Sequence, residues 1–196
     1  MRTIFKSLLI APILAAALTL SACSGAAVNS NESTVKSDKS SSAAKPSETK
    51  KAEDKPGDSI NSPARSGSSV SITDPMSGTY DVTFSDFNAD ATSAIAAANM
   101  FNDPAPQGQK YVTVNVSVKN TRTDGQTLSP SLAVYNTTLI VDGQSYSAAT
   151  VVPPGTPINS AADVAPGATA TGALVFAVPS AATTAVASIG GKFISL

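Results

Sequence analysis

Apolar and polar residues alternate with a period of two over much of the second half of the chain, which is the pattern of a strand with one buried face. The clearest run is residues 111–119, where valine fills every second position from residue 112 and polar side chains lie between. The same alternation occurs in residues 78–87 through Tyr80, Val82 and Phe84. Both stretches are therefore predicted to be strands that pack on a core through one face only.

Turn signals divide the rest of this region into further short strands. Asp142-Gly143 and Gly190-Gly191 are both two-residue hairpin signals. Short strands separated in this way predict an all-β fold, an antiparallel β-sandwich over residues 70–196. Its other strands are expected at residues 132–141, 144–146, 172–178, 184–189 and 192–196.

One segment breaks the β pattern. Residues 90–100 are rich in alanine, with Asp90 placed as an N-cap and Pro104 following as a stop. We expect one short helix here, inserted in the first connection between strands. Because an isolated helix of this length is marginal in water, it should pack on the sandwich through Ile95 and Met100.

The start of the chain has the pattern of a secretory signal peptide, which we assign to residues 1–22. Arg2 and Lys6 form a basic beginning, and residues 7–20 form a mainly apolar run. This run is shorter than the roughly 20 apolar residues that span a bilayer. A short membrane helix and a plain cleaved signal are the alternatives.

Leu20, Ser21, Ala22 and Cys23 follow, and they resemble a bacterial lipobox at every position. Cys23 is the only cysteine of the chain, and a lone thiol in a secreted protein needs an explanation other than a disulfide. The resemblance implies a diacylglyceryl (palmitate-type) lipid on the Cys23 sulfur and cleavage that makes Cys23 the new N-terminus. We therefore expect a lipoprotein anchored on the extracytoplasmic face of the cell membrane.

Residues 23–69 are predicted to be the lipidated cysteine and a disordered linker. The segment mixes serine, alanine, lysine and acidic residues, has no aromatic residue, and contains only Val28, Val35 and Ile60 as large apolar side chains. Such a segment cannot bury enough surface to offset the entropy lost on ordering. It is either a spacer that lifts the domain off the membrane or a merely tolerated connection.

Charge and residue types narrow the functions open to the predicted domain. Residues 70–196 carry four cationic side chains against eight aspartates, a net charge of −4, so they offer no basic surface for nucleic acid. The chain has no histidine, which excludes hydrolase triads that use a histidine base and zinc sites that use histidine. We expect a non-enzymatic protein without a cofactor.

Asp86, Asn88 and Asp90 have the oxygen spacing of the start of a calcium-binding loop. Ala91 stands where the sixth position requires glycine, and Ala97 stands where the twelfth requires glutamate. We therefore favour turn and capping roles for these residues, with a loose cation site as the alternative.

Two further features are candidates for ligand contact. Tyr111 and Tyr135 are possible sugar-stacking residues, although tyrosines more often fill a core or lie at strand edges. The loop at residues 151–157 contains three prolines and is moderately apolar. It either presents a stiff contact surface or simply crosses between the sheets.

The strand motifs resemble a known group of domains. Residues 108–120 are similar to the G-x-x-[YF]-V-x-V-x-V-x-V-x-N stretch of immunoglobulin-like domains in Gram-positive surface lipoproteins, and residues 165–179 are similar to their PG…G-x-L-V-F-x-V-P ending. These domains are of unknown function and are similar in fold to an immunoprotective extracellular mycobacterial antigen. The resemblance implies the same fold and an envelope location, and it supplies no catalytic residues.

These features together predict a binding or structural module at the cell envelope, with an envelope protein as its partner. The alternative is an accessory or sensor module that binds a small ligand or a cation. In both interpretations the lipid on Cys23 makes the contact with the membrane.

Overall fold

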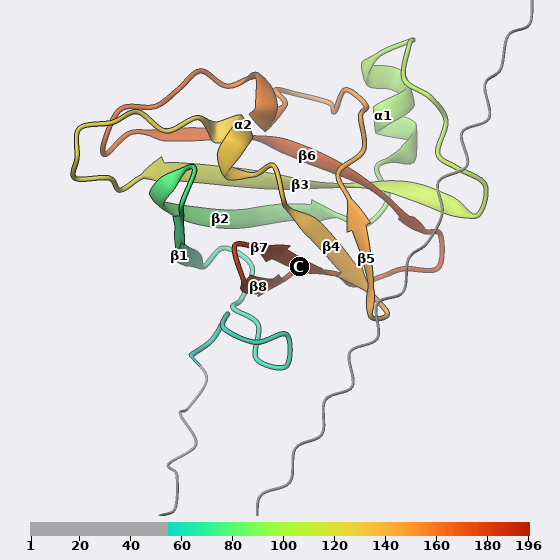
Figure 1. Ribbon diagram of the computed structural model, residues 1–196. Coiled ribbons are helices and arrows are strands. Elements are labelled where there is room, and N and C mark those ends of the chain that lie inside the picture. The colour runs from blue at the N-terminus through green and yellow to red at the C-terminus, as the bar shows by residue number, and fades with distance from the viewer. Residues whose placement is uncertain (1–54) are drawn as a thin grey trace, which may run out of the picture. The chain divides into compact units, whose positions relative to one another are not determined.

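Two antiparallel sheets of four strands each form the described part of the chain, residues 55–196, in this computed structural model (Figure 1). The long sheet has the order β1-β2-β3-β6, and the short sheet has the order β5-β4-β7-β8. The long sheet consists of β1 (Ser69–Asp74), β2 (Gly78–Asn88), β3 (Gln109–Asn120) and β6 (Thr169–Pro179). The short sheet consists of β4 (Thr138–Val141), β5 (Gln144–Ser147), β7 (Val186–Ile189) and β8 (Lys192–Ser195). The predicted all-β antiparallel sandwich is confirmed.

The long sheet contributes much of the core. β3 pairs with β2 on one side and with β6 on the other. Alternate residues of β3 are 1% exposed or less, and they pack with the fully buried Phe84 of β2 and Phe176 of β6. The period-two predictions for β2 and β3 are therefore confirmed. The buried residues of β3 on this face are Val112, Val114, Val116 and Val118.

The short sheet is built from two hairpins, and both have the turns that the sequence predicts. Asp142-Gly143 joins β4 to β5, and Gly190-Gly191 joins β7 to β8. All four turn residues have positive φ, which type I′ turns require at both central positions. The buried face of this sheet carries Leu139, Val141, Ala187, Ile189 and Ile194.

The helix α1 (Thr92–Ala98) confirms the predicted helical insertion between β2 and β3. Ile95 is fully buried in a small cluster with Tyr111 and Val175 on the long sheet. The predicted packing of Met100 is wrong, because the helix ends before it and Met100 is 86% exposed in the turn that follows. No helix within residues 55–196 is long and apolar enough to cross a membrane.

The prediction of a strand over residues 132–141 is wrong in its first half. The helix α2 (Pro130–Ala133) occupies the start of this segment, and β4 begins only at Thr138. Proline at the first turn favours the helix because its fixed φ is already helical. A second unpredicted element, the 3-10 helix η1 (Ile158–Ser160), lies beside α2.

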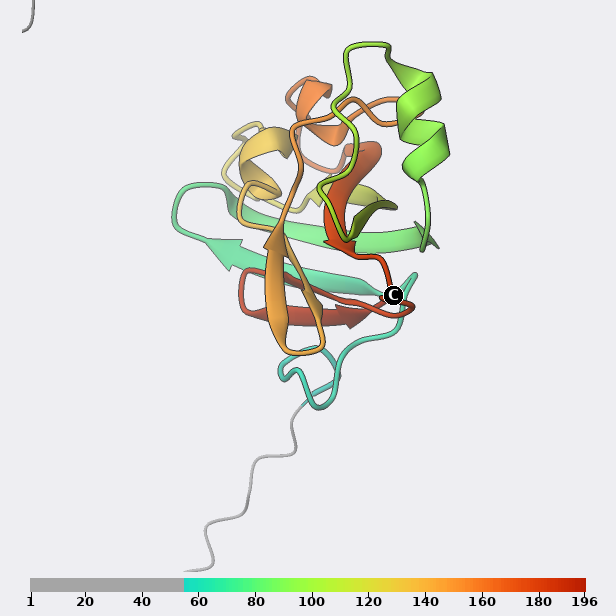
Figure 2. The same cartoon turned by 90° about the vertical axis from the view of Figure 1, so that its right-hand side faces the viewer.

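Residues 55–68 contact the sandwich, so the prediction of a disordered linker up to residue 69 is wrong for this part. Ala64 is buried beside β8: its N–H donates to the carbonyl of Phe193 at 2.8 Å, and its carbonyl accepts from the N–H of Ser195 at 2.8 Å. Backbone hydrogen bonds hold the segment, and composition does not reveal these. In both views α1 lies at the end of the domain away from this segment (Figures 1 and 2).

Asn120, the last residue of β3, is a fully buried polar residue. Its amide donates to the carbonyls of Gln126 and Val164, each at 2.9 Å, and its side-chain oxygen accepts from the N–H of Arg122 at 2.9 Å. These bonds satisfy the buried amide and close the loop after β3 onto the segment that leads into β6.

Candidate binding site

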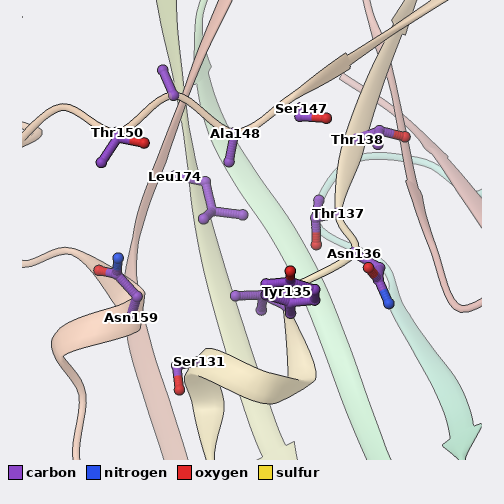
Figure 3. A pocket seen from close by; sticks show the side chains of 12 residues that line it. Ser131, Tyr135, Asn136, Thr137, Thr138, Ser147, Ala148, Thr150, Asn159 and Leu174 are labelled. Atoms are coloured by element: carbon purple, nitrogen blue, oxygen red, sulfur yellow. The ribbon is translucent and has the colours of Figure 1, made fainter. Parts of the chain in front are cut away.

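A cavity of about 460 Å³ lies between α2, the start of β4, the end of β5 and η1 (Figure 3). Its volume falls in the range of small-molecule sites, about 300–1,000 Å³. The apolar part of its wall consists of Val134, Ala148, Ala149 and Leu174. The polar part consists of Ser131, Tyr135, Asn136, Thr137, Thr138, Ser147, Thr150 and Asn159. We call it the Tyr135 cavity, after the exposed aromatic residue in its wall.

A hydrogen-bonded turn after α2 holds Tyr135 in place. The N–H of Tyr135 donates to the carbonyl of Leu132 at 3.2 Å, and the N–H of Thr137 donates to the carbonyl of Val134 at 3.0 Å. The side chain of Val134 is buried in the core, whereas that of Tyr135 is 78% exposed. The backbone of the turn is therefore fixed while the aromatic ring is accessible.

Tyr80 of β2 anchors α2 to the long sheet. Its buried hydroxyl donates to the carbonyl of Ala133 at 2.9 Å, directly before the turn that carries Tyr135. Burial raises the pKa of Tyr80 to about 12, and the negative charge of Asp74 adds to this effect. The hydroxyl consequently stays protonated at neutral pH and remains a donor.

Thr137 is 2% exposed, and its hydroxyl makes no hydrogen bond within residues 55–196. A buried hydroxyl without a partner costs about 1–3 kcal/mol. The oxygen is directed toward the side of the cavity where Tyr135 and Asn136 lie (Figure 3). The oxygen itself has almost no accessible surface, so a ligand can form a hydrogen bond with it only after the side chains that cover it move aside.

The wall that carries Asn159 depends on a close approach between two backbone segments. A Cβ atom on Gly172 of β6 would lie 2.5 Å from the nitrogen and 2.6 Å from the Cα of Ile158, so a larger residue does not fit without a backbone shift. The N–H of Ala173 also donates to the carbonyl of Thr156 at 2.9 Å. These contacts seat η1 on β6 and set the position of Asn159.

The chemistry of the cavity is that of a neutral polar site. Within the described residues, the phenol of Tyr135 is the one ionisable group of its wall, and the other polar groups are hydroxyls and amides. Hydroxyls and amides each donate and accept hydrogen bonds. The arrangement can bind and orient an uncharged ligand that offers both polar and apolar surface.

The predicted cation-site residues lie in β2 and just after it, and each is used locally. Asp86 accepts from the amide of Asn115 at 3.1 Å and has a φ of 52° at an irregularity in the pairing of β2 with β3. Asn88 accepts from the N–H of Asp90 at 3.1 Å. Asp90, one residue before the N-cap of α1, accepts from the N–H of Thr92 at 3.1 Å, which holds the pKa of Asp90 below its ordinary value. Among residues 55–196, no three acidic, histidine or cysteine side chains converge on one point.

Tyr111 is a core residue, which confirms the more common role expected for it and removes the sugar-stacking alternative at this position. It is 4% exposed, and its hydroxyl donates to the carbonyl of Asp103 at 3.2 Å. Burial raises the pKa of Tyr111, with the charge of Asp103 as a smaller cause. Of the two candidate tyrosines, Tyr135 is the accessible one.

Side-chain hydrogen bonds of Asn102 join the loop at residues 151–157 to the segment after α1. The Asn102 amide donates to the carbonyl of Val152 at 2.9 Å, and its oxygen accepts from the N–H of Val152 at 2.8 Å. The same amide donates to the carbonyl of Ile95 at 2.7 Å. These bonds favour the interpretation of the loop as a structural crossing from β5 to η1.

Sequence reasoning singled out Tyr135 but missed Thr137 and Asn159. Both lie in or beside short elements that show no periodicity, and Pro130 is the one local signal that a helix interrupts the strand pattern. The predicted lipidation residues lie outside the described part of the chain: Leu20, Ser21, Ala22 and Cys23.

Comparison with known proteins places the chain in a family. MPT63, a secreted protein from Mycobacterium tuberculosis, is 18% identical with a TM-score of 0.46, and the match covers 67% of this chain and 93% of that one. An uncharacterized β-sandwich protein from Clostridium difficile 630 is 19% identical with a TM-score of 0.41, over 76% of this chain and 99% of that one. No curated protein matches the sequence. The model of a domain of unknown function (DUF4352) matches residues 78–189, and the chain therefore belongs to the DUF4352 family.

Proposed function

We propose that the chain is a lipid-anchored protein of the extracytoplasmic membrane face and that its β-sandwich is a non-enzymatic binding module. The observation that carries the binding role is the Tyr135 cavity, whose wall includes an exposed aromatic ring on a hydrogen-bonded turn and, beneath the surface, the unpaired hydroxyl of Thr137. A site whose groups are already held in place loses little conformational freedom when a ligand binds. The cavity is thus suited to recognition.

The membrane location rests on the N-terminal sequence. Leu20 and the small residues Ser21 and Ala22 precede Cys23 in the order of a lipobox, after an apolar run of signal-peptide length. A diacylglyceryl anchor is stable because each buried methylene contributes about 0.8 kcal/mol and two acyl chains act together.

The substitution Cys23→Ser tests the anchor. We expect the variant to move from the membrane fraction to the soluble extracytoplasmic fraction, because serine lacks the sulfur that carries the lipid. Cell fractionation with immunoblotting measures the shift, and mass spectrometry of the wild-type N-terminal peptide identifies the modification. Ser21→Ala keeps a small residue in the lipobox and should stay in the membrane fraction. Retention of Cys23→Ser in the membrane would contradict the anchor.

The binding role is tested on the secreted Cys23→Ser protein with a panel of neutral small compounds. We expect at least one compound to shift the NMR amide signals of Tyr135 and Thr137 in a saturable way. The signals of Asn88 and Asp90 should not move, because these residues lie outside the cavity. Absence of any response at the cavity would contradict the binding role, and chemical conversion of a bound compound would contradict the non-enzymatic role.

A further inference from the structure

We infer that the Tyr135 cavity binds a neutral saccharide, an inference that rests on the binding role proposed above and adds the class of ligand. Three features point to this class. They are the uncharged wall, the unpaired hydroxyl of Thr137, and the exposed ring of Tyr135.

The wall of the cavity selects against charged ligands and against purely apolar ones. Apart from the phenol of Tyr135, its side chains are apolar or neutral and polar. A charged ligand would lose its hydration without gaining an opposite charge. A purely apolar ligand would bury the accessible hydroxyls and amides of the wall without partners. The ligand must therefore carry hydrogen-bonding groups and no net charge.

The polar side chains suit a ligand with several hydroxyl groups. Thr137 supplies a buried hydroxyl that needs a partner. Asn136 and Asn159 are exposed and lie on opposite sides of the view in Figure 3, and each amide offers both donors and an acceptor. A sugar hydroxyl also donates and accepts, so it can pair with either kind of group.

Tyr135 provides a surface for the ring of a sugar. Its side chain is 78% exposed, while its backbone is fixed by the hydrogen bond to Leu132. The face of an aromatic ring is electronegative and attracts the C–H groups on the apolar face of a pyranose. Leu174 and Ala148 add apolar surface to the same cavity.

An extended peptide fits this site less well. A peptide that adds to a sheet needs free backbone N–H and C=O groups at the sheet edge. The segment beside the cavity has already engaged such groups, because Ala148 is bridged to Phe176 and the N–H of Ala149 donates to the carbonyl of Val175 at 2.8 Å. Side chains are the groups that remain for recognition.

The experiment is an NMR titration of the Cys23→Ser protein with cellobiose, maltotriose, N,N′-diacetylchitobiose and a blocked Ala-Pro-Ala peptide. Each probe is taken to about 10 mM, because a Kd near 1 mM corresponds to a weak single-ring contact. We expect a saccharide, and not the peptide, to shift Tyr135 and Thr137. Tyr135→Ala should weaken that binding about tenfold, which is about 1.4 kcal/mol. Phe101→Ala is the matched control, because Phe101 is 85% exposed and does not line the cavity.

Thr137→Val separates ligand contact from a structural role. Valine keeps the shape and removes an unpaired hydroxyl, so the melting temperature should stay the same or rise, while saccharide affinity falls about threefold to tenfold. Binding of the peptide at the cavity without any saccharide would overturn the saccharide assignment and leave the binding role intact. Saccharide affinity unchanged in both Tyr135→Ala and Thr137→Val would also overturn the assignment. If no probe shifts the NMR signals of the cavity residues, both the binding role and the saccharide assignment are contradicted.

Discussion

The long and the short sheet differ in how strongly sequence determines their structure. β3 and β6 pair in one unshifted register from Gln109 to Lys119, and the valines of β3 face one continuous core. A slip by one residue would turn all of these side chains to the wrong face, so the register is strongly specified. Each strand of the short sheet has four residues, and its pairing depends instead on two glycine-containing turns.

The candidate site is formed mainly by the elements whose structure the sequence determines less strongly. Of the residues that line the Tyr135 cavity, Leu174 alone belongs to the long sheet. The others come from α2, the short sheet, η1 and the segments between them. The difference shows a division of labour, in which a rigid sheet carries the fold and short, separately anchored elements carry recognition.

The largest expected effect compares the same substitution in the two sheets. Val116→Ala in the long sheet should lower the free energy of unfolding by about 2–3 kcal/mol, because it leaves a cavity between two fixed strands. Val141→Ala, at an equally buried position of the short sheet, should cost about half as much, since a four-residue strand can relax into the space. Urea denaturation of both variants measures the difference. Equal losses would show that the two sheets are equally rigid.

A smaller loss of stability is expected from Gly172→Ala, which places a methyl group in the close contact between β6 of the long sheet and η1. Its Cβ would overlap the backbone of Ile158, and overpacking of this kind costs about 1–3 kcal/mol. The amide signals of Asn159 and Thr137 should shift, because η1 must move away from β6. Thr169→Ala, at the exposed first residue of the same strand, should change stability by no more than about 0.5 kcal/mol. Unmoved signals for Asn159 in Gly172→Ala would show that η1 is not positioned by this contact.

The smallest effect concerns the exposed loop after β3. The side-chain hydrogen bond from Arg122, at 2.6 Å, lowers the pKa of Asp124 from 3.8 to about 2, and the N–H of Gln126 adds to the shift. A carboxyl group whose pKa is lower in the folded state stabilises the fold above its unfolded pKa, and this contribution is lost as the pH falls through the folded value. Asp124→Asn should therefore be slightly less stable than the wild type at pH 7, with the gap closing between about pH 4 and pH 2. Melting curves at both ends of this range measure the gap, and a gap that does not change with pH would remove the assigned role.

The parts of the fold that sequence predicts are those in which burial repeats along the strand. β2 and β3 show their core faces in every second residue, and the hairpin turns show their need for positive φ through glycine. β6 departs from this pattern, because its residues 172–176 are all buried. Sequence patterns do not predict α2, because a helix of four residues is too short to show helical periodicity. Its position also depends on a hydrogen bond from Tyr80, which is distant in sequence. The cavity is hidden for the same reason, since Ser131 and Leu174 meet only after the chain has crossed between the sheets. The ordered segment before β1 is held by backbone groups, which every residue type except proline supplies.

The pairing of Ala64 with β8 bears on how copies of this protein interact when many of them lie close together. A free strand edge is a template on which another copy of the same protein can add its own strand and begin to aggregate. Ala64 occupies the outer edge of β8, and Ala149 with Thr156 occupies part of the outer edge of β6. One exposed edge in each sheet is thus partly covered by the chain itself. This cover leaves fewer free backbone groups at these two edges for the strand of another copy to pair with.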